Sequence, residues 1–471
     1  MQAVLTKYWL AIHVALLLFA SWASLFLSRA SVFVFLLWMS LMAVEALVLL
    51  PTVRKSETLA DARLRVGQTI VRDPFFYLGL SVVGIVVVQW LNSGCSLVYL
   101  PDGDVWQRKP PAIPWAPFSV EPGDALRYVS IFSACFWGGL ILRHSVGKAG
   151  KRALLTVASI FSGILACYMV WQACLGRVPY AGLALNPGAS AYGSFFGFWL
   201  LLGMGAYLET LARGQRVAKA LFVFGFIGNL AGMLFFSSAI ELVLYLVVTL
   251  LFLVYWLAYV RTFATKAMQV LFFLVVLATV ASVVVSVVFM FPGNPVITKL
   301  RSLAEFGQAW ADMSGARGIR VSAAIKIWKE HLWVGVGANG FFHFVGTAVE
   351  GKAWGLIKND PDFVYNDGLQ ALCEFGVLGA SLLGAGVVTL LVPVCYRMRL
   401  VWMQGGGEKK GGTSFLLRLS PFVGAGLCAT ILCFFESWVS NPFRSPGLLT
   451  SWVFVMATLP SFLPVNGRAV A

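Results

Sequence analysis

The sequence predicts an all-α fold, a polytopic helical membrane protein with about twelve transmembrane helices and a large outer loop. Three observations support this prediction. The 471 residues are 59% hydrophobic and only 12% charged, with a mean hydropathy of +0.83, whereas a soluble domain is about 25% charged. Apolar runs of about 20 residues, long enough to cross the hydrocarbon layer as helices, recur along the chain. Lys and Arg gather in alternate connections between these runs.

The apolar runs give the expected spans in order. They lie near residues 8–27, 32–50, 74–91, 128–142, 153–175, 189–211, 218–236, 239–260, 268–291, 370–396, 419–438 and 447–464. The first run lacks a convincing small-residue cleavage site and is followed closely by another run, so we expect a retained helix rather than a signal peptide. The stretch 218–260 is twice the length that one span needs, and we divide it at the polar turn "FFSSAIE".

The positive charges predict the orientation. Lys and Arg are concentrated in the connections after the second, fourth, sixth, eighth and tenth spans, as expected for cytoplasmic loops. Both termini are therefore expected in the cytoplasm. This topology accounts for most of the net charge of +15, so nucleic acid is not an expected partner.

Two long connections are expected outside the membrane, within a single integral membrane domain that covers residues 1–471. They are 92–127 and 292–369, the second lying between the ninth and tenth spans and large enough for a small subdomain. Within it, "RGIRVSAAIKIWKEHLW" can form an amphipathic helix along the membrane surface. The expected apolar stripe of this helix is Val321, Ala324, Ile325, Trp328 and Leu332. The Gly-rich segment 404–414 is typical of a flexible cytoplasmic linker.

The outer helix carries a pair of guanidiniums. Arg317 and Arg320 are three residues apart and so share one helical face. Arg offers a rigid fork of donors that suits a diphosphate, and its charge stabilises the negative charge that develops as a phosphate leaving group departs. The alternative is a basic interfacial helix, including Lys326 and Lys329, that touches anionic lipid headgroups.

An acid enters the tenth apolar run. In "VYNDGLQALCEFGVLG", Glu374 lies within the apolar part, and an intramembrane carboxylate is costly unless it is paired or faces water. Asp367, two helical turns earlier, can share its face. The two acids are candidates for a functional site, and the structural alternative is a snorkelling or helix-capping acid.

Three further residues are candidates for substrate binding. Arg444 lies in "NPFRSP", where flanking prolines stiffen an outer turn, and it is either a second diphosphate contact or an interfacial anchor. Asn186 opens the sixth span, as an N-cap or a ligand to sugar hydroxyls. His343 is the histidine that we retain as an outer-face base, because an imidazole is the side chain most often used as a base near neutral pH.

Two patterns that can indicate a cofactor are better explained as turns. The glycines of "VGVGANGFFHF" follow no predicted strand, so we expect a tight turn rather than a nucleotide loop. The pairs Asp102/Asp104 and Asp360/Asp362 stand beside Pro or Gly, as solvated turns do. The sequence therefore predicts no metal and no cofactor.

These motifs, in this order, resemble the O-antigen ligase and O-antigen polymerase family of integral membrane glycosyltransferases. In that family an N-P/N turn opens a span, and an Arg-bearing helix of the large outer loop runs into a GVG turn. A His-Asn/Ser-x-x-Leu segment then leads into E-x-G-x-x-G. The corresponding segments here are Asn186-Pro187, Arg320 in "RGIRVSAAIKIW", Gly335-Val336-Gly337, "YNDGL" from Tyr365 and "EFGVLG" from Glu374.

The resemblance implies a reaction. Members of the family take a glycan from a polyprenyl diphosphate at the outer face of the bacterial inner membrane and join it to an acceptor sugar hydroxyl, without metal or nucleotide. Ligases use the lipid A core as acceptor, and polymerases use another repeat unit. By this resemblance Arg317 and Arg320 would hold the diphosphate, Tyr365 and Asp367 would face the acceptor hydroxyl, and Glu374 would orient that segment. The expected partners are the lipid-linked donor, the glycan acceptor and membrane lipids.

The chain departs from the family pattern at two places. The family's His corresponds to Tyr365, and a phenol with a pKa near 10 is a poor base at pH 7, although it can donate a hydrogen bond. Asp367 or His343 can substitute for it. The Ser-Arg that precedes the eighth span in the family is Ser237-Ser238 here, and Arg444 or Arg177 can supply the missing guanidinium.

These departures keep a non-catalytic binder of lipid-linked glycan open as an alternative to a transferase. A transporter is a third alternative, and it predicts polar residues and broken helices at mid-membrane, whereas the charges gather at the outer ends of the spans.

Overall fold

The structure is a computed structural model of the chain. It describes residues 2–26, 30–49, 51, 57–94, 97–100, 105–175, 188–212, 216–237, 239–260, 306–349, 351–357, 363–405 and 419–463. The chain divides into two compact units, which are described separately. The first comprises Met1–Val146, Trp310–Leu390 and Ser437–Phe454, and the second comprises Gly147–Ala309, Leu391–Glu436 and Val455–Ala471.

The fold is helical, as predicted, and five described helices are long and apolar enough to cross a membrane. They are Ala30–Leu49, Pro74–Leu91, Pro122–His144, Lys148–Ala173 and Asp367–Met403. Shorter apolar helices occur at Trp9–Ser24, Gly225–Phe236, Glu241–Phe252, Pro421–Glu436 and Pro446–Phe462. Eleven of the twelve predicted runs coincide with a helix, and the run at 268–291 lies outside the described residues. Most of the predicted linker 404–414 also lies outside them.

The first unit begins with five helices, α1 (Gln2–Phe26), α2 (Ala30–Leu49), α3 (Leu59–Val71), α4 (Pro74–Leu91) and α5 (Pro122–His144). Helix α5 packs against α1, α2 and α4. Helix α3 starts with a capping box between Thr58 and Asp61, and Asp73 caps α4 ahead of a proline at its first turn. The ring of Phe136 fills the space in which Gly79 has no side chain, which brings α4 and α5 close together.

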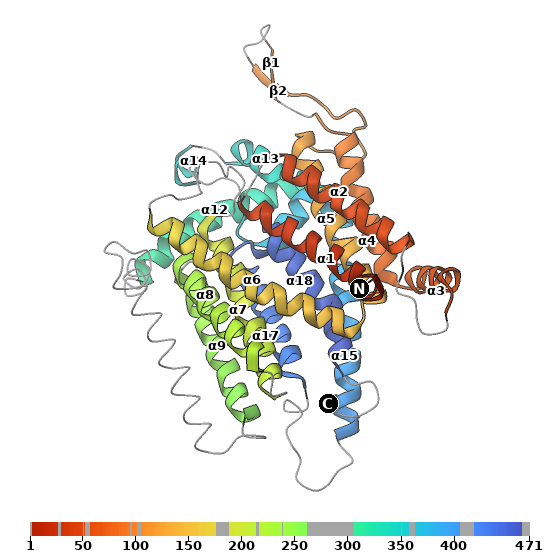
Figure 1. The fold of residues 1–471 in the computed structure, drawn as a ribbon. Coiled ribbons are helices and arrows are strands. Elements are labelled where there is room, and N and C mark those ends of the chain that lie inside the picture. The colour runs from red at the N-terminus through yellow and green to blue at the C-terminus, as the bar shows by residue number, and fades with distance from the viewer. Residues whose placement is uncertain are drawn as a thin grey trace. The chain divides into compact units, whose positions relative to one another are not determined.

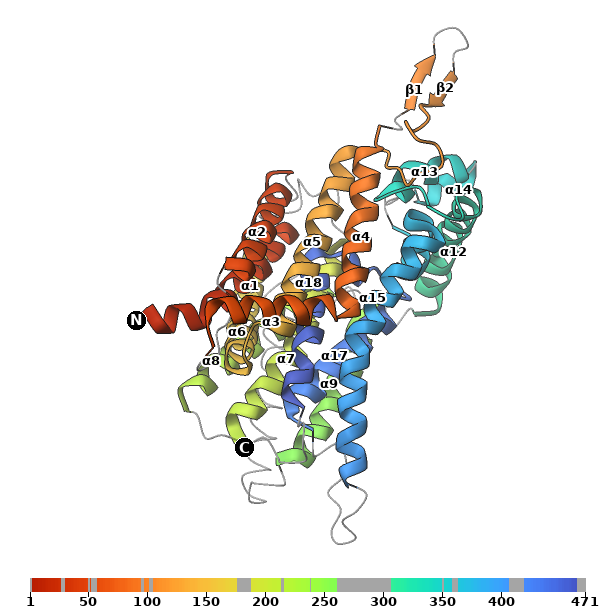
Figure 2. The same cartoon turned by 90° about the vertical axis from the view of Figure 1, so that its right-hand side faces the viewer.

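The two long connections carry short elements at one end of the first unit. In 92–127 the strands β1 (Leu97–Leu100) and β2 (Val105–Arg108) form an antiparallel hairpin that extends past the ends of α4 and α5 (Figure 1), the only sheet among the described residues. In 292–369 the described elements are α12 (Phe306–Glu330), α13 (Gly340–Ala348) and α14 (Lys352–Ile357). They lie at the same end of this unit as the hairpin (Figure 2).

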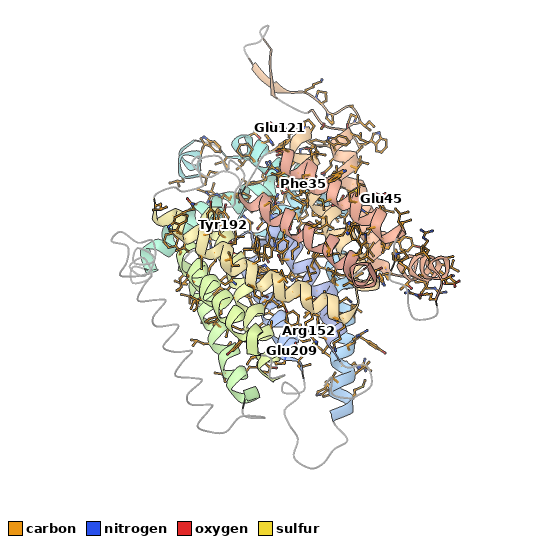
Figure 3. All side chains as sticks on the ribbon, in the orientation of Figure 1. Phe35, Glu45, Glu121, Arg152, Tyr192 and Glu209 are labelled. Carbon is orange, nitrogen blue, oxygen red and sulfur yellow. The ribbon has the colours of Figure 1, made fainter. Side chains whose placement is uncertain are left out.

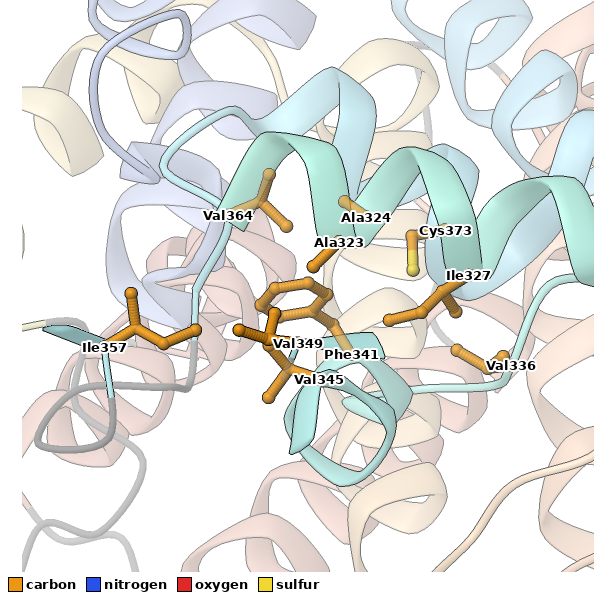
Figure 4. Close-up of a cluster of buried hydrophobic side chains, with 10 residues drawn as sticks. All are labelled: Ala323, Ala324, Ile327, Val336, Phe341, Val345, Val349, Ile357, Val364 and Cys373. Carbon is orange, nitrogen blue, oxygen red and sulfur yellow. The ribbon is translucent and has the colours of Figure 1, made fainter. Parts of the chain in front are cut away.

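Helix α12 packs on α13 through a small apolar core (Figure 4). Its buried face is formed by Ala323, Ala324 and Ile327, which surround Phe341 of α13 together with Val364. The buried face differs from the predicted stripe. The helix packs on protein on the side of Ile327, whereas Ile325 of the predicted stripe is only half-buried. The described part of the 292–369 connection therefore packs on itself through this core.

Helix α15 (Asp367–Gly405) is broken at Gly376, where φ is 62° and ψ is −171°. The carbonyls of Cys373 and Glu374, which would accept bonds from the next helical turn, accept instead from the N–H groups of Val336 (3.0 Å) and Gly337 (2.8 Å). In return, the N–H groups of Val377 and Leu378 donate to the carbonyls of Leu332 and Trp333, at 2.9 and 3.2 Å. The break thus leaves these backbone groups paired, as a membrane helix requires. The glycine turn predicted after α12 therefore belongs to the segment that pairs with the break.

The first unit ends with the 3-10 turn η2 (Pro442–Arg444) and the part of α18 (Pro446–Thr458) that precedes Val455. The second unit contains α6 (Lys148–Cys174), α7 (Gly188–Ala212), α8 (Arg216–Phe236), α9 (Ala239–Val260), α17 (Pro421–Glu436) and η3 (Leu459–Phe462). Helix α8 packs on α6 and α7, and α17 packs on α7. An ion pair of 2.9 Å joins Arg152 of α6 to Glu209 of α7 (Figure 3).

Candidate functional site

The two arginines of α12 meet one aromatic ring. The guanidinium carbons of Arg317 and Arg320 lie 5.6 and 5.0 Å from the ring centroid of Tyr365, within cation–π range. Arg320 is buried and Arg317 is half-buried. Tyr365 has φ of 59°, a left-handed conformation that is unusual for an aromatic residue. A strained backbone of this kind is often found at functional sites and persists only where its surroundings hold it.

Glu374 is completely buried, and its carboxylate forms an ion pair with Arg444. The side-chain amide of Gln370 donates to its Oε1 at 3.1 Å, and the backbone N–H of Asn339 lies beside the same carboxylate. The Arg444 guanidinium also lies over the ring of Tyr128, with its carbon 5.4 Å from the centroid. Burial lowers the pKa of Arg444 to about 9, so it remains protonated at pH 7.

Asp367 fixes the turn that carries Arg444. Its Oδ2 accepts from the backbone N–H of Phe443 at 3.1 Å, and its own N–H donates to the carbonyl of Ser437 at 3.0 Å. These bonds tie the start of α15 to η2. They hold Arg444, the next residue after Phe443, in reach of Glu374.

A second acid, which the sequence did not single out, lies at the start of α5. Asp124 is buried, and its Oδ2 accepts from Asn339 Nδ2 at 3.1 Å and contacts His343 Nε2 at 3.2 Å. Arg127, one turn further along α5, lies 3.7 Å from the other oxygen. Asn339 stands at the N-cap of α13 in the left-handed conformation, and its side chain binds Asp124 instead of capping the helix. Asp124 is therefore joined to both ends of the first turn of α13.

The same acid belongs to a group of residues that can hold a metal ion. Ligand atoms of Glu121, Asp124 and His343 lie within 4.8 Å of one another. Glu121 is exposed at the start of α5 (Figure 3). The chemistry of the group does not favour a cation, because Arg127 and the Asn339 amide already neutralise and bind the Asp124 carboxylate.

The predicted site residues that the structure describes lie in the first unit but do not form one cluster. Arg317, Arg320 and Tyr365 lie together. Arg444 and Glu374 pair with each other, so the predicted second diphosphate contact has a carboxylate partner. Asp367 binds a backbone N–H, and His343 pairs with Asp124. Outside the described residues lie Asn186, Arg177, Asp102, Asp104, Asp360 and Asp362.

Sequence reasoning missed Asp124, Asn339, Gln370 and Tyr128. Asp124 carries a weak signal, because it follows Pro122 at the start of an apolar run, where a carboxylate stabilises the first helical turn. Asn339 lies in the glycine turn, where Asn tolerates the left-handed conformation. Neither signal identifies the residue of another helix that the side chain contacts.

Comparisons with known proteins leave the fold and the site as the basis for function. No protein-family model matches the chain, and no curated protein matches it in sequence.

Proposed function

We propose that this protein is a membrane glycosyltransferase of the O-antigen ligase type, which transfers a glycan from a polyprenyl diphosphate donor to an acceptor sugar hydroxyl. The observation that carries the proposal is the pair of guanidiniums of Arg317 and Arg320 on the ring of Tyr365. Two cationic forks beside one aromatic ring suit a diphosphate that carries a sugar. Arginine forks bind phosphate oxygens, and an aromatic ring can pack against the apolar face of a sugar.

The chemistry follows from charge. When the glycan leaves, the diphosphate gains negative charge at its terminal oxygen, and fixed guanidiniums stabilise that charge. Arg320 is suited to this role because it is buried and extends from α12 one turn before Ala323 and Ala324 of the buried face. The Glu374–Arg444 pair and Asp367 would act one step away, by fixing the segment that carries Tyr365.

The proposal includes a topology. Twelve spans, both termini in the cytoplasm and a site at the outer face of the bacterial inner membrane would bring the site to a lipid-linked donor. Support comes from the positive charges of alternate connections. The location of the site residues on α12, α13 and the early part of α15, at the hairpin end of the first unit, agrees with it.

The test uses purified full-length protein in lipid nanodiscs, with a fluorescent polyprenyl diphosphate-linked oligosaccharide as donor. One arm receives lipid A core as acceptor and a second arm receives only more donor. Transfer to the core supports a ligase, and chain extension in the second arm supports a polymerase. Donor binding without transfer in either arm would contradict the enzyme and favour a non-catalytic binder, which the tyrosine at position 365 makes the second candidate.

A further inference from the structure

Helix α3 connects α2 to α4, and both of these helices are long and apolar enough to cross a membrane. Two successive spans leave their connection at one membrane surface, so α3 begins and ends there. Its 13 residues rise about 20 Å, which is less than the hydrocarbon thickness of about 30 Å. Figure 2 shows α3 running across the direction of α4. This is the direction expected of a helix that lies on the surface and does not span it.

One apolar face of α3 is open. Ala60, Leu64, Gly67 and Val71 follow the spacing i, i+4, i+7 and i+11, which places them in one stripe along the helix. All four residues are exposed, Leu64 by 64% and Val71 by 53%. A Cβ added at Gly67, in the middle of the stripe, would meet no atom within 4 Å. The stripe is therefore free to contact a partner.

The face of α3 that packs on protein is a different one. Ala62 and Val66 are its buried residues. At about 100° per residue they lie roughly opposite the middle of the stripe. The exposed apolar side chains thus do not belong to the core of the first unit.

Polar side chains border the stripe on both edges. Arg72 and Gln68 follow one edge and Arg63 follows the other, and all three residues are exposed. Asp61, the acid of this helix, is engaged by Thr58 in the capping box. An apolar stripe between guanidiniums matches the boundary between the acyl chains and the anionic headgroups of a bilayer.

Both ends of α3 are attached to helices of membrane-crossing length, which fixes the direction of the stripe. At the first end, Arg63 Nη2 donates at 3.0 Å to the carbonyl of Leu49, the last residue of α2. That carbonyl is one of those that a helix leaves without an internal partner. At the second end, Asp73 caps α4 and pairs with Arg143 of α5 at 2.8 Å. Arg143 also donates to the carbonyl of Thr389 in α15 at 3.1 Å.

We infer that α3 is an interfacial helix that binds anionic lipid, at the membrane surface where α2 ends and α4 begins. Leu64 and Val71 contact the acyl chains, and Arg63 and Arg72 lie at the phosphates. A second copy of the chain fits the stripe less well. A stable protein interface takes about 20–30 residues a side, whereas the stripe has four, and a symmetric pair would bring its arginines together. The placement does not depend on the proposed glycan transfer.

The test introduces the photo-crosslinker p-benzoylphenylalanine in place of Leu64 or of Thr69 in the full-length protein. Thr69 is exposed on the side of α3 away from the stripe and is the matched control. The nanodiscs contain phosphatidylethanolamine and phosphatidylglycerol, and mass spectrometry identifies each adduct. We expect lipid adducts at position 64 to exceed those at position 69 by about tenfold, the preference that burial of one large apolar side chain gives.

The headgroup is tested with the crosslinker kept at position 64. Arg72→Gln should lower the enrichment of phosphatidylglycerol over phosphatidylethanolamine among the adducts by about fivefold, the effect of one arginine near an anionic surface. Lys109→Gln removes an exposed cation beyond the far end of α4 and should leave the enrichment unchanged.

Two results at position 64 would overturn the placement of α3. They are lipid adducts no more abundant than at position 69, and crosslinked dimers of the chain in place of lipid adducts. An unchanged enrichment in Arg72→Gln would overturn the binding of anionic headgroups. Wild-type protein gives an independent reading if a labelled variant misfolds. The nanodisc should shield Leu64 and Val71 from hydroxyl radicals generated in water, and oxidation of both side chains would contradict the inference.

Discussion

Replacing Gly376 by alanine tests the break in α15, which holds the glycine turn against the segment that carries Glu374. The φ of 62° and ψ of −171° belong to a region that only glycine enters readily. An added Cβ would also lie against the carbonyl of Trp333 and 2.5 Å from the nitrogen of Val334. The backbone strain alone costs about 1–3 kcal/mol. If the clash opens the pairing, four hydrogen bonds at about 1 kcal/mol each are lost as well.

The matched control is Gly384→Ala in the same helix. Nothing lies within 4 Å of a Cβ at Gly384, and alanine in a helix is favoured over glycine by about 1 kcal/mol. We therefore expect Gly376→Ala to unfold at a clearly lower temperature than wild type in detergent and to lose transfer activity, while Gly384→Ala unfolds at the same temperature or higher. Equal melting temperatures for the two variants would refute the described break and the pairing with residues 332–337.

Three further predictions concern other parts of the chain. Burial alone would raise the pKa of Asp73, but the hydrogen bond from His144 and the charge of Arg143 outweigh it and hold the pKa below its ordinary value. The stability that this adds is present above the ordinary pKa of about 4 and is lost as pH falls through the folded value. Asp73→Asn should therefore lower the unfolding free energy by about 3 kcal/mol at pH 7, and the difference from wild type should shrink on acidification in a pH series of melts. Tyr365→His should keep or raise transfer activity if position 365 faces the acceptor, and a sharp loss in the nanodisc assay would mean that the ring has a separate role beside Arg320. Chelation with EDTA should leave transfer unchanged, and restoration of lost activity by one divalent cation would instead assign the group at Asp124 to a metal.

The helices of this protein follow from composition, because long apolar runs have one stable backbone conformation in lipid. The ends of α4 and α5 are also readable, since Asp73-Pro74 and Pro122 mark helix starts. The two-stranded hairpin in 92–127 was not predicted. Its strands are only four residues long, too short for a period of two to stand out.

The site was predictable only in part. The spacing of Arg317 and Arg320 identified a common helical face, because three residues bring side chains together on a helix. The pairs of Arg444 with Glu374 and of His343 with Asp124 join residues that are far apart in the sequence. Periodicity says which face of a helix is buried but not which residue of another helix it meets. The role of Arg444 was therefore left between a diphosphate contact and an anchor, and the structure gives it a carboxylate partner instead.

The measurement that tests the central claim most directly is donor affinity on nanodiscs, with a fluorescent polyprenyl diphosphate oligosaccharide as probe. Wild-type protein is compared with Arg317→Ala, Arg320→Ala and Lys329→Ala. Lys329 is exposed on the same helix and serves as the control for general attraction to anionic headgroups. Loss of one charged hydrogen-bonding group should cost about 2 kcal/mol, or roughly 30-fold in Kd. We predict this loss for both arginine variants and a Kd within twofold of wild type for Lys329→Ala. Equal, small losses in all three variants would mean that α12 only touches lipid, and they would contradict the diphosphate site.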